Sequence, residues 1–314
     1  MALVIISIIL AADTTAVIRS PQEGKVGERQ QPLGSSLDFK AKHPIVIIAG
    51  GIDTISIRNQ SLAYIPLFLP LLLVLHHPPS TMAPKIILYT NHICPWAHRA
   101  HIALKELGLE YEEVIIDLDT PREPWYLEVN PRGLVPTISY NGTIIPESGI
   151  VAQLLADAHP SHLLPPSNIE AGAIQRAQVA FFVDTFFSKL LPLVFGAQKA
   201  TDEEQPAATE AIVAGIEKND IEGLLYPAGS GSGPFFHGAE KLTQVEVLTG
   251  SFLLRLLSFH KYGLLAPEFP GLLEKRAPKF LQWAKAVVAQ ESVNYIWDEK
   301  KVGTRSAARF KPKN

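Results

Sequence analysis

The segment from residue 86 to residue 158 alternates between short apolar runs and stretches with helical spacing, which limits the fold more than any other feature. Residues 86–89 and 114–116 have the pattern of short buried strands, and a helix is predicted to start at Pro95 and to end at Gly108. Asn141-Gly142 is a two-residue turn signal, so residues 137–140 and 143–145 are expected to pair as an antiparallel hairpin. Further helices are predicted before and after this hairpin. The predicted order is β-α-β-α-β-β-α, an α/β domain over residues 82–160.

The pattern changes beyond residue 160. Prolines and serines interrupt residues 161–168, which we interpret as an interdomain linker. Apolar residues then recur at helical spacing through residues 169–198, 206–225, 243–259 and 272–288, so residues 169–298 are predicted to form an all-helical domain. Thr243 and Glu246 have the spacing of a helix capping box, with Leu242 placed to pack on Val247.

The two ends of the chain carry no periodic pattern that completes either domain. Residues 2–12 are apolar but lack the preceding basic residue of a signal peptide, and residues 62–75 are too short and proline-interrupted for a membrane span. We expect residues 1–81 to be a disordered leader or a gene-model artefact, and residues 299–314 to be a solvated basic tail. The net charge of −3 does not indicate nucleic-acid binding.

Cys94 is the only cysteine, and it lies where the first predicted strand meets the helix that starts at Pro95. The free N–H groups and the dipole of a helix N-terminus favour an anion, so this thiol is expected to ionise more easily than a free cysteine. The alternative is a buried, inert cysteine. Because Ala97 replaces the second cysteine of a dithiol motif, oxidised Cys94 needs an external thiol, for which glutathione is the abundant intracellular candidate. A single cysteine favours a reducing, cytoplasmic compartment.

Metal binding is not predicted. One thiolate cannot build a cysteine-rich zinc site, and the ten histidines contain no His-Glu-x-x-His pair. His98 and His101 are three residues apart and are expected on the helix surface.

Four phenylalanines, Phe181, Phe182, Phe186 and Phe187, spread over the predicted helix 169–198. Aromatic rows on a helix usually pack in the core. We expect most of these rings in the core, with one or two free to line a substrate cleft.

Three motifs together resemble the soluble glutathione transferases, specifically the omega-like cysteine class. They are Cys94-Pro95-Trp96-Ala97, Asn130-Pro131-x-Gly133-x-Val135-Pro136 and Glu147-Ser148, in family order and at family spacing. The resemblance covers residues 85–298 and implies a thioredoxin-like α/β N-terminal domain followed by an all-α C-terminal domain, with the active cleft between them. The first motif continues with His98-Arg99 and also resembles the glutathionyl-hydroquinone reductases (the xi class), which leaves the class open.

The resemblance also implies roles for individual residues, with glutathione as co-substrate and without a metal. Cys94 is the catalytic residue. Pro136 is implied to follow a cis bond, so that Val135 offers its backbone to the cysteine of glutathione. Glu147 is implied to pair with the ammonium group and Ser148 with the carboxylate of the γ-glutamyl end, although both could simply cap the helix. The implied glutathione-binding set is completed by two residues: Trp96, and Arg122 toward the glycine carboxylate.

The sequence therefore predicts a glutathione-dependent thiol transferase, a deglutathionylating reductase with a single cysteine nucleophile. It is expected to be a cytoplasmic homodimer that acts on a small hydrophobic or disulfide substrate, without nucleic-acid or membrane partners. Two alternatives remain open. One is glutathione conjugation to electrophiles in detoxification or secondary metabolism, with Cys94 as a bystander, and the other is a non-catalytic glutathione-binding scaffold.

Overall fold

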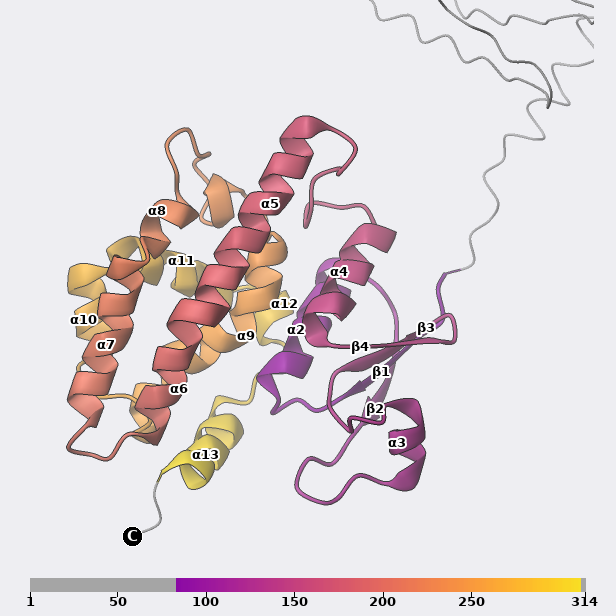
Figure 1. Cartoon of the computed structure of the whole chain (residues 1–314), viewed down its shortest axis with the longest axis horizontal. Helices are drawn as coiled ribbons and strands as arrows, with labels where there is room; N and C mark the ends of the chain where they lie inside the picture. The colour runs from indigo at the N-terminus through magenta and orange to yellow at the C-terminus, as the bar shows by residue number, and fades with distance from the viewer. Residues whose placement is uncertain (1–82, 312–314) are drawn as a thin grey trace, which may run out of the picture. The chain divides into compact units, whose positions relative to one another are not determined.

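The computed structural model describes residues 83–311, and Figure 1 shows a small sheet domain packed beside a larger helical one. The expectations for residues 1–81 lie outside the described residues. The buried apolar side chains of the sheet domain and of the helical domain join in one continuous core, to which Leu88, Leu104, Phe182 and Leu253 all belong. The two domains therefore share a packed interface.

The sheet has four strands in the order β2-β1-β3-β4, namely β1 (Ile86–Thr90), β2 (Glu112–Ile115), β3 (Thr137–Tyr140) and β4 (Thr143–Pro146). β1 and β2 are parallel, and the other pairs are antiparallel. Asn141 and Gly142 both have positive φ, at 51° and 86°, as the tight hairpin between β3 and β4 requires. The predicted strands, their order along the chain and the predicted hairpin are confirmed.

Three helices cover this sheet: α2 (Pro95–Glu106), α3 (Pro124–Val129) and α4 (Ser148–Ala158). α2 and α4 pack against each other, while α3 lies on the opposite side of the sheet (Figure 1). The alternation of side chains along β1 agrees, because Thr90 contacts His101 of α2 whereas Tyr89 contacts Trp125 and Tyr126 of α3. This is the thioredoxin-like arrangement that the family resemblance implies.

The helical domain begins with a long run made of α5 (Glu170–Thr185), a π-helical turn η1 (Phe186–Leu190) and α6 (Leu191–Lys199). The run is long and apolar enough to cross a membrane by length and composition alone. It packs instead on the other helices through Phe182, Phe186 and Leu190. The remaining elements are α7 (Gln205–Lys218), α8 (Ile221–Leu225), η2 (Phe236–Gly238), α9 (Gln244–Ser258), η3 (Phe259–Tyr262), α10 (Phe269–Arg276), α11 (Pro278–Val288), α12 (Glu291–Asn294) and α13 (Glu299–Phe310).

Helix α9 is buried along almost its whole length and contacts α2, α4, α5 and α11. The predicted capping box is present at its N-terminus, where the buried Glu246 carboxylate accepts from both the backbone N–H and the hydroxyl of Thr243, each at 2.7 Å. The same carboxylate accepts from the Trp283 indole and from the Phe236 backbone N–H, both at 2.8 Å. One side chain thus joins three segments of the helical core.

Three expectations from the sequence are wrong. His98 and His101 are fully buried rather than surface residues, because α2 is covered by the sheet and α4 on one side and by α9 and α12 on the other. Two predicted helices are each split: 206–225 into α7 and α8 at Asp220, which has a positive φ of 48°, and 272–288 into α10 and α11 at Pro278, which has no N–H to continue the hydrogen-bond ladder. Residues 299–310 form α13, with Val302 and Gly303 buried, rather than a solvated tail.

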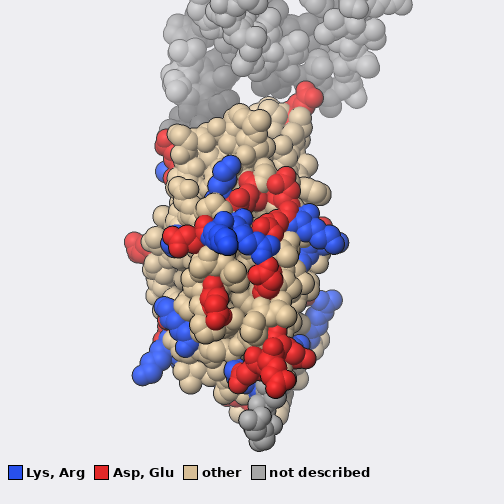
Figure 2. All heavy atoms as spheres, turned by 90° about the vertical axis from the view of Figure 1, so that its left-hand side faces the viewer, with Lys and Arg blue, Asp and Glu red and all other residues tan. Residues whose placement is uncertain are grey.

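Figure 2 views the helical domain from the side on which α7, α8 and α10 lie in Figure 1. Positive and negative side chains are interspersed on this face, and Arg276 of α10 is paired with Glu210 and Glu217 of α7. A nucleic-acid surface would need clustered positive charge, which this face does not have.

Candidate functional site

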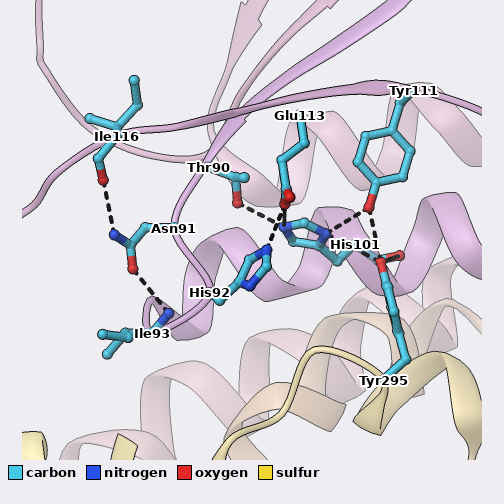
Figure 3. A network of polar contacts seen from close by, with 9 residues as sticks. All are labelled: Thr90, Asn91, His92, Ile93, His101, Tyr111, Glu113, Ile116 and Tyr295. Carbon is cyan, nitrogen blue, oxygen red and sulfur yellow. Dashed lines mark hydrogen bonds and ion pairs between the residues drawn. The ribbon is translucent and has the colours of Figure 1, made fainter. Parts of the chain in front are cut away.

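Cys94 is the N-cap residue of α2, in the loop that follows β1. Pro95 occupies the first helical position, and the Cys94 carbonyl accepts the first helical hydrogen bond from the His98 N–H at 3.1 Å. Asn91 holds the loop in place, since its side chain donates to the Ile116 carbonyl at 2.9 Å and accepts from the Ile93 N–H at 3.0 Å (Figure 3). The thiol therefore occupies the helix start that the sequence predicts.

The second motif forms a turn beside the thiol. The bond between Val135 and Pro136 is cis, as the resemblance implies, and the Cys94 Sγ donates to the Val135 carbonyl at 3.9 Å. Asn130 braces this motif, because its side chain donates to the Leu134 carbonyl at 3.0 Å and to the Thr137 hydroxyl at 2.9 Å. Cys94 and Val135 are thus brought together.

The environment of Cys94 opposes its ionisation. Burial raises the pKa of the Cys94 thiol, whereas the N–H groups of Trp96 and Ala97 and the positive charge of Arg255 act in the opposite direction. Burial is the largest of these effects. The expectation that this thiol ionises more easily than a free cysteine is therefore wrong, because the helix start that favours the thiolate is also partly dehydrated by the helical domain.

Arg255 of α9 is a buried cation beside the cysteine loop. Its guanidinium donates to the Ile93 carbonyl and to the Ser251 carbonyl, both at 2.7 Å, and lies over the Trp297 ring at 5.0 Å. None of the ion pairs formed between residues 83 and 311 includes Arg255. Burial lowers its pKa to about 9, and the attraction to Cys94 works against that change. No sequence signal distinguishes this arginine from the others.

Glu147 and Ser148 lie where β4 ends and α4 begins. Glu147 has a positive φ of 73°, and its side chain makes no capping hydrogen bond to α4. Instead, its exposed carboxylate accepts from Arg132 at 2.6 Å. The Ser148 hydroxyl is buried and accepts from Arg99 at 2.9 Å. The alternative in which the Glu147 side chain only caps the helix is wrong.

Arg99 is a second buried arginine that the sequence reasoning did not select. Besides Ser148, it donates to the Leu248 carbonyl of α9 at 2.8 Å, and its guanidinium lies 4.3 Å from the Phe187 ring centre. Burial lowers its pKa to about 9. This side chain joins α2, α4 and α9, and thereby ties the sheet domain to the helical domain.

Trp96 points toward the helical domain. Its ring lies 4.8 Å from that of Phe252 and 5.5 Å from that of Phe187, and it keeps 37% of its surface exposed. A cavity of about 400 Å³ between α4, α5 and α9 is lined by Phe187, Leu248 and the buried Gln244, among others. Of the four phenylalanines considered in the sequence, Phe187 is thus the one that both lines this cavity and packs against Arg99.

The Arg122 guanidinium hydrogen-bonds to backbone carbonyls. It donates to the carbonyls of Gly133, Asp117 and Thr120 at 2.9, 2.7 and 2.8 Å. Gly133 has a φ of 60°, and a Cβ there would come within 2.9 Å of the Arg122 side chain. In this structure Arg122 therefore braces the loop before α3 against the turn that leads to Val135.

Comparisons with known proteins agree with this geometry. A family model described as the glutathione S-transferase N-terminal domain matches residues 93–158. Glutathione transferase omega-1 of Caenorhabditis elegans is 27% identical over 224 residues, which cover 67% of this chain and 79% of the relative. Glutathione S-transferase omega-1 of Mus musculus is 28% identical over 205 residues, covering 65% and 76%.

Solved structures lead to the same family. Glutathione transferase omega 2C of Trametes versicolor is 29% identical with a TM-score of 0.59, and the match covers 72% of this chain and 99% of that one. Rice GST1, solved in complex with glutathione, is 26% identical with a TM-score of 0.61, covering 73% and 97%. The thioredoxin-like sheet, the cis-proline turn beside a helix-start cysteine and these relatives together lead to one conclusion: the chain belongs to the glutathione transferase superfamily, is omega-like, and is an enzyme.

Proposed function

We propose that the chain is a glutathione-dependent thiol transferase that removes glutathione from mixed disulfides, with Cys94 as its nucleophile. The observation that carries this proposal is the position of Cys94: a lone cysteine at a helix N-terminus, with its sulfur at 3.9 Å from the Val135 carbonyl of the cis-proline turn. A pure binding protein has no need of a thiol at this point. The omega class of the relatives supports the same assignment.

The reaction has two thiol–disulfide exchanges. The Cys94 thiolate attacks the glutathionyl sulfur of a mixed disulfide, which forms a Cys94–glutathione disulfide and releases the substrate as a thiol. A second glutathione thiolate attacks that disulfide, which releases oxidised glutathione and restores the Cys94 thiolate. Ala97 offers no second thiol, so the resolving thiol comes from solution. The net reaction converts one mixed disulfide and one glutathione into one thiol and one oxidised glutathione.

We propose that the residues selected from the sequence form the glutathione site, with the roles of Trp96 and Arg122 changed to fit the structure. Val135 and Pro136 would hold the cysteine of glutathione, while Glu147 and Ser148 would hold the γ-glutamyl end. Trp96 faces Phe187 and Phe252, and so suits the hydrophobic acceptor rather than glutathione itself. Arg122 reaches the glycine carboxylate only if it releases one of its three backbone carbonyls.

Glutathione conjugation to an electrophile is the second candidate function. It is favoured by the burial that raises the Cys94 pKa, because a neutral thiol is a poor nucleophile and glutathione would then supply the attacking sulfur. The aromatic rings of Trp96, Phe187 and Phe252 would suit an apolar electrophile.

One comparison of two variants separates the two functions. The wild type and Cys94→Ala are assayed with hydroxyethyl disulfide, with glutathionyl-phenacyl conjugates and with chlorodinitrobenzene, and glutathione binding is measured by calorimetry. We expect Cys94→Ala to lose the first two activities by a factor of 100 or more and to keep glutathione affinity within about two-fold. Retention of full reductase activity by Cys94→Ala contradicts the proposal and leaves conjugation.

The organisation of the chain is proposed on the same basis. We propose residues 82–160 as the glutathione-binding domain, 161–168 as the linker and 169–298 as the substrate domain, with residues 1–81 dispensable for turnover. A homodimer in the cytoplasm is the assembly and location that we expect. Deletion of residues 1–81, followed by activity assays and light scattering, tests both the boundary and the oligomeric state.

A further inference from the structure

Three potential metal ligands converge on one side of the cysteine loop. They are His92 in the loop, His101 of α2 and Glu113 of β2 (Figure 3). Glu113 Oε1 lies 2.7 Å from His92 Nε2 and 3.4 Å from His101 Nε2, and all three ligand atoms lie within 4.8 Å of one another. Two imidazoles and one carboxylate on three different elements form a preorganised set rather than a chance pair.

The surroundings of His101 orient its ring. Its Nδ1 lies 2.9 Å from the Tyr111 hydroxyl, which lies 3.1 Å from the Tyr295 hydroxyl, and Tyr295 donates to the His101 carbonyl at 3.3 Å. All three contacts are satisfied at once when Nδ1–H donates to Tyr111 and Tyr111 donates to Tyr295. In that tautomer the lone pair of His101 is on Nε2, which faces the Glu113 carboxylate. Such outer hydrogen bonds are typical of histidines that bind metals.

Two electron-rich atoms then face each other. His101 Nε2 and Glu113 Oε1 are 3.4 Å apart, and in this tautomer the same nitrogen accepts from the Thr90 hydroxyl at 2.8 Å, a hydrogen bond that a bound cation would replace. A cation between the nitrogen and the carboxylate would attract both. In a tetrahedral zinc site with bonds of about 2.0–2.2 Å, ligand atoms are roughly 3.3–3.5 Å apart. The His101–Glu113 distance already has this value, and the exposed His92 side chain has to shift by only a fraction of an ångström from Glu113.

We propose that His92, His101 and Glu113 bind one divalent cation of the zinc type, with a water molecule as the fourth ligand. Imidazole nitrogens favour zinc and its neighbours over calcium and magnesium, which prefer oxygen ligands. His92 and Glu113 are partly exposed, with 43% and 32% of their side-chain surfaces accessible, so the ion has an entry path. The sequence prediction of no metal site overlooked this set, because the three residues are spread over twenty-two positions and meet only in the fold.

The bound ion would connect the cysteine loop to β2 and α2. His92 precedes Cys94 by two positions, and Asn91 already ties the same loop to the end of β2. Metal binding should therefore stabilise the folded protein, since the site does not exist in the unfolded chain.

The test uses the full chain after treatment with a chelator and dialysis. Co²⁺ is titrated and followed by its visible absorption, Zn²⁺ is added in competition, and melting temperatures are recorded with and without Zn²⁺. The variants are His92→Ala and Glu113→Gln. His162→Ala is the matched control, because His162 also pairs with a glutamate, Glu106, at 2.9 Å, but no third potential ligand joins that pair within residues 83–311. Cys94→Ala shows whether the thiol contributes.

We expect one Co²⁺ per chain, displaced by Zn²⁺ and not by Mg²⁺, and a Zn²⁺-dependent rise in melting temperature. His92→Ala and Glu113→Gln should weaken binding by at least ten-fold and abolish that rise, while His162→Ala and Cys94→Ala stay within about two-fold of the wild type. Wild-type affinity in both His92→Ala and Glu113→Gln, or loss of binding in Cys94→Ala, would overturn the proposal. Absence of Co²⁺ and Zn²⁺ binding in the wild type would do the same.

Discussion

The guanidinium of Arg255 donates a hydrogen bond of 2.7 Å to the carbonyl of Ile93, the residue before Cys94. The donor comes from α9 of the helical domain, and the acceptor lies in the cysteine loop of the sheet domain. Ser251, one turn earlier on α9, donates to the Pro95 carbonyl at 2.8 Å. The helical domain therefore places a positive charge near the thiol. It also fixes the backbone on both sides of Cys94.

The first prediction concerns the charge of Arg255. Because burial raises the Cys94 pKa and Arg255 lowers it, Arg255→Gln should raise it further and slow alkylation at neutral pH by about ten-fold. Rates of iodoacetamide alkylation measured against pH check this, and the wild type should already have a midpoint above that of a free cysteine. Arg276→Gln, which removes a surface arginine, should match the wild type. A midpoint below that of a free cysteine in the wild type contradicts the prediction.

The second prediction concerns Glu147 and its partner Arg132. If Glu147 binds the ammonium group of glutathione, Glu147→Gln should raise the glutathione Kd by about ten-fold or more. The exposed ion pair contributes little stability, so the melting temperature should barely change. Arg132→Gln removes the same ion pair but leaves the carboxylate free, and should keep or improve the affinity. Equal losses of affinity in the two variants would show that the ion pair, rather than the carboxylate, matters.

The third prediction concerns the contribution of Glu246 to the free energy of unfolding. Its carboxylate is fully buried and accepts from two backbone N–H groups, one hydroxyl and one indole. Glu246→Ala leaves these donors without an acceptor, so the free energy of unfolding should fall by about 3 kcal/mol or more. Urea unfolding measures the loss. Glu240→Gln, on the exposed surface nearby, should leave stability unchanged, and a loss below about 1 kcal/mol for Glu246→Ala would contradict the prediction.

The fourth prediction is acid sensitivity through His98. Burial lowers the pKa of His98 well below its ordinary value, so the folded protein resists the proton that the unfolded chain accepts near pH 6.5. The free energy of unfolding should therefore fall as the pH drops below about 6.5, by at most about 1.4 kcal/mol per pH unit for this group. The free energy of unfolding between pH 8 and pH 5 should change less for His98→Leu than for the wild type. Parallel pH dependences for the two proteins contradict the assignment.

Local patterns determined the sheet domain. The hairpin at Asn141-Gly142, the helix start at Cys94 and the capping box of Glu246 each depend on residues close together in the chain, and all are present in the structure. The cis bond before Pro136 was implied by a motif of the same local kind. Turn and cap chemistry acts over a few residues, which is why such features can be predicted from the sequence.

Tertiary packing decided the rest. The burial of His98, His101 and Cys94 depends on α9 and α12, which follow them by more than 140 positions. This burial, rather than the helix dipole, has the largest effect on the pKa of the Cys94 thiol. The buried arginines Arg99 and Arg255 reach the site for the same reason. The sequence by itself determined which local structures form and which thiol lies at a helix start. Only the fold decided which charges surround that thiol and which faces lose water, because burial and electrostatics depend on neighbours that no local pattern contains.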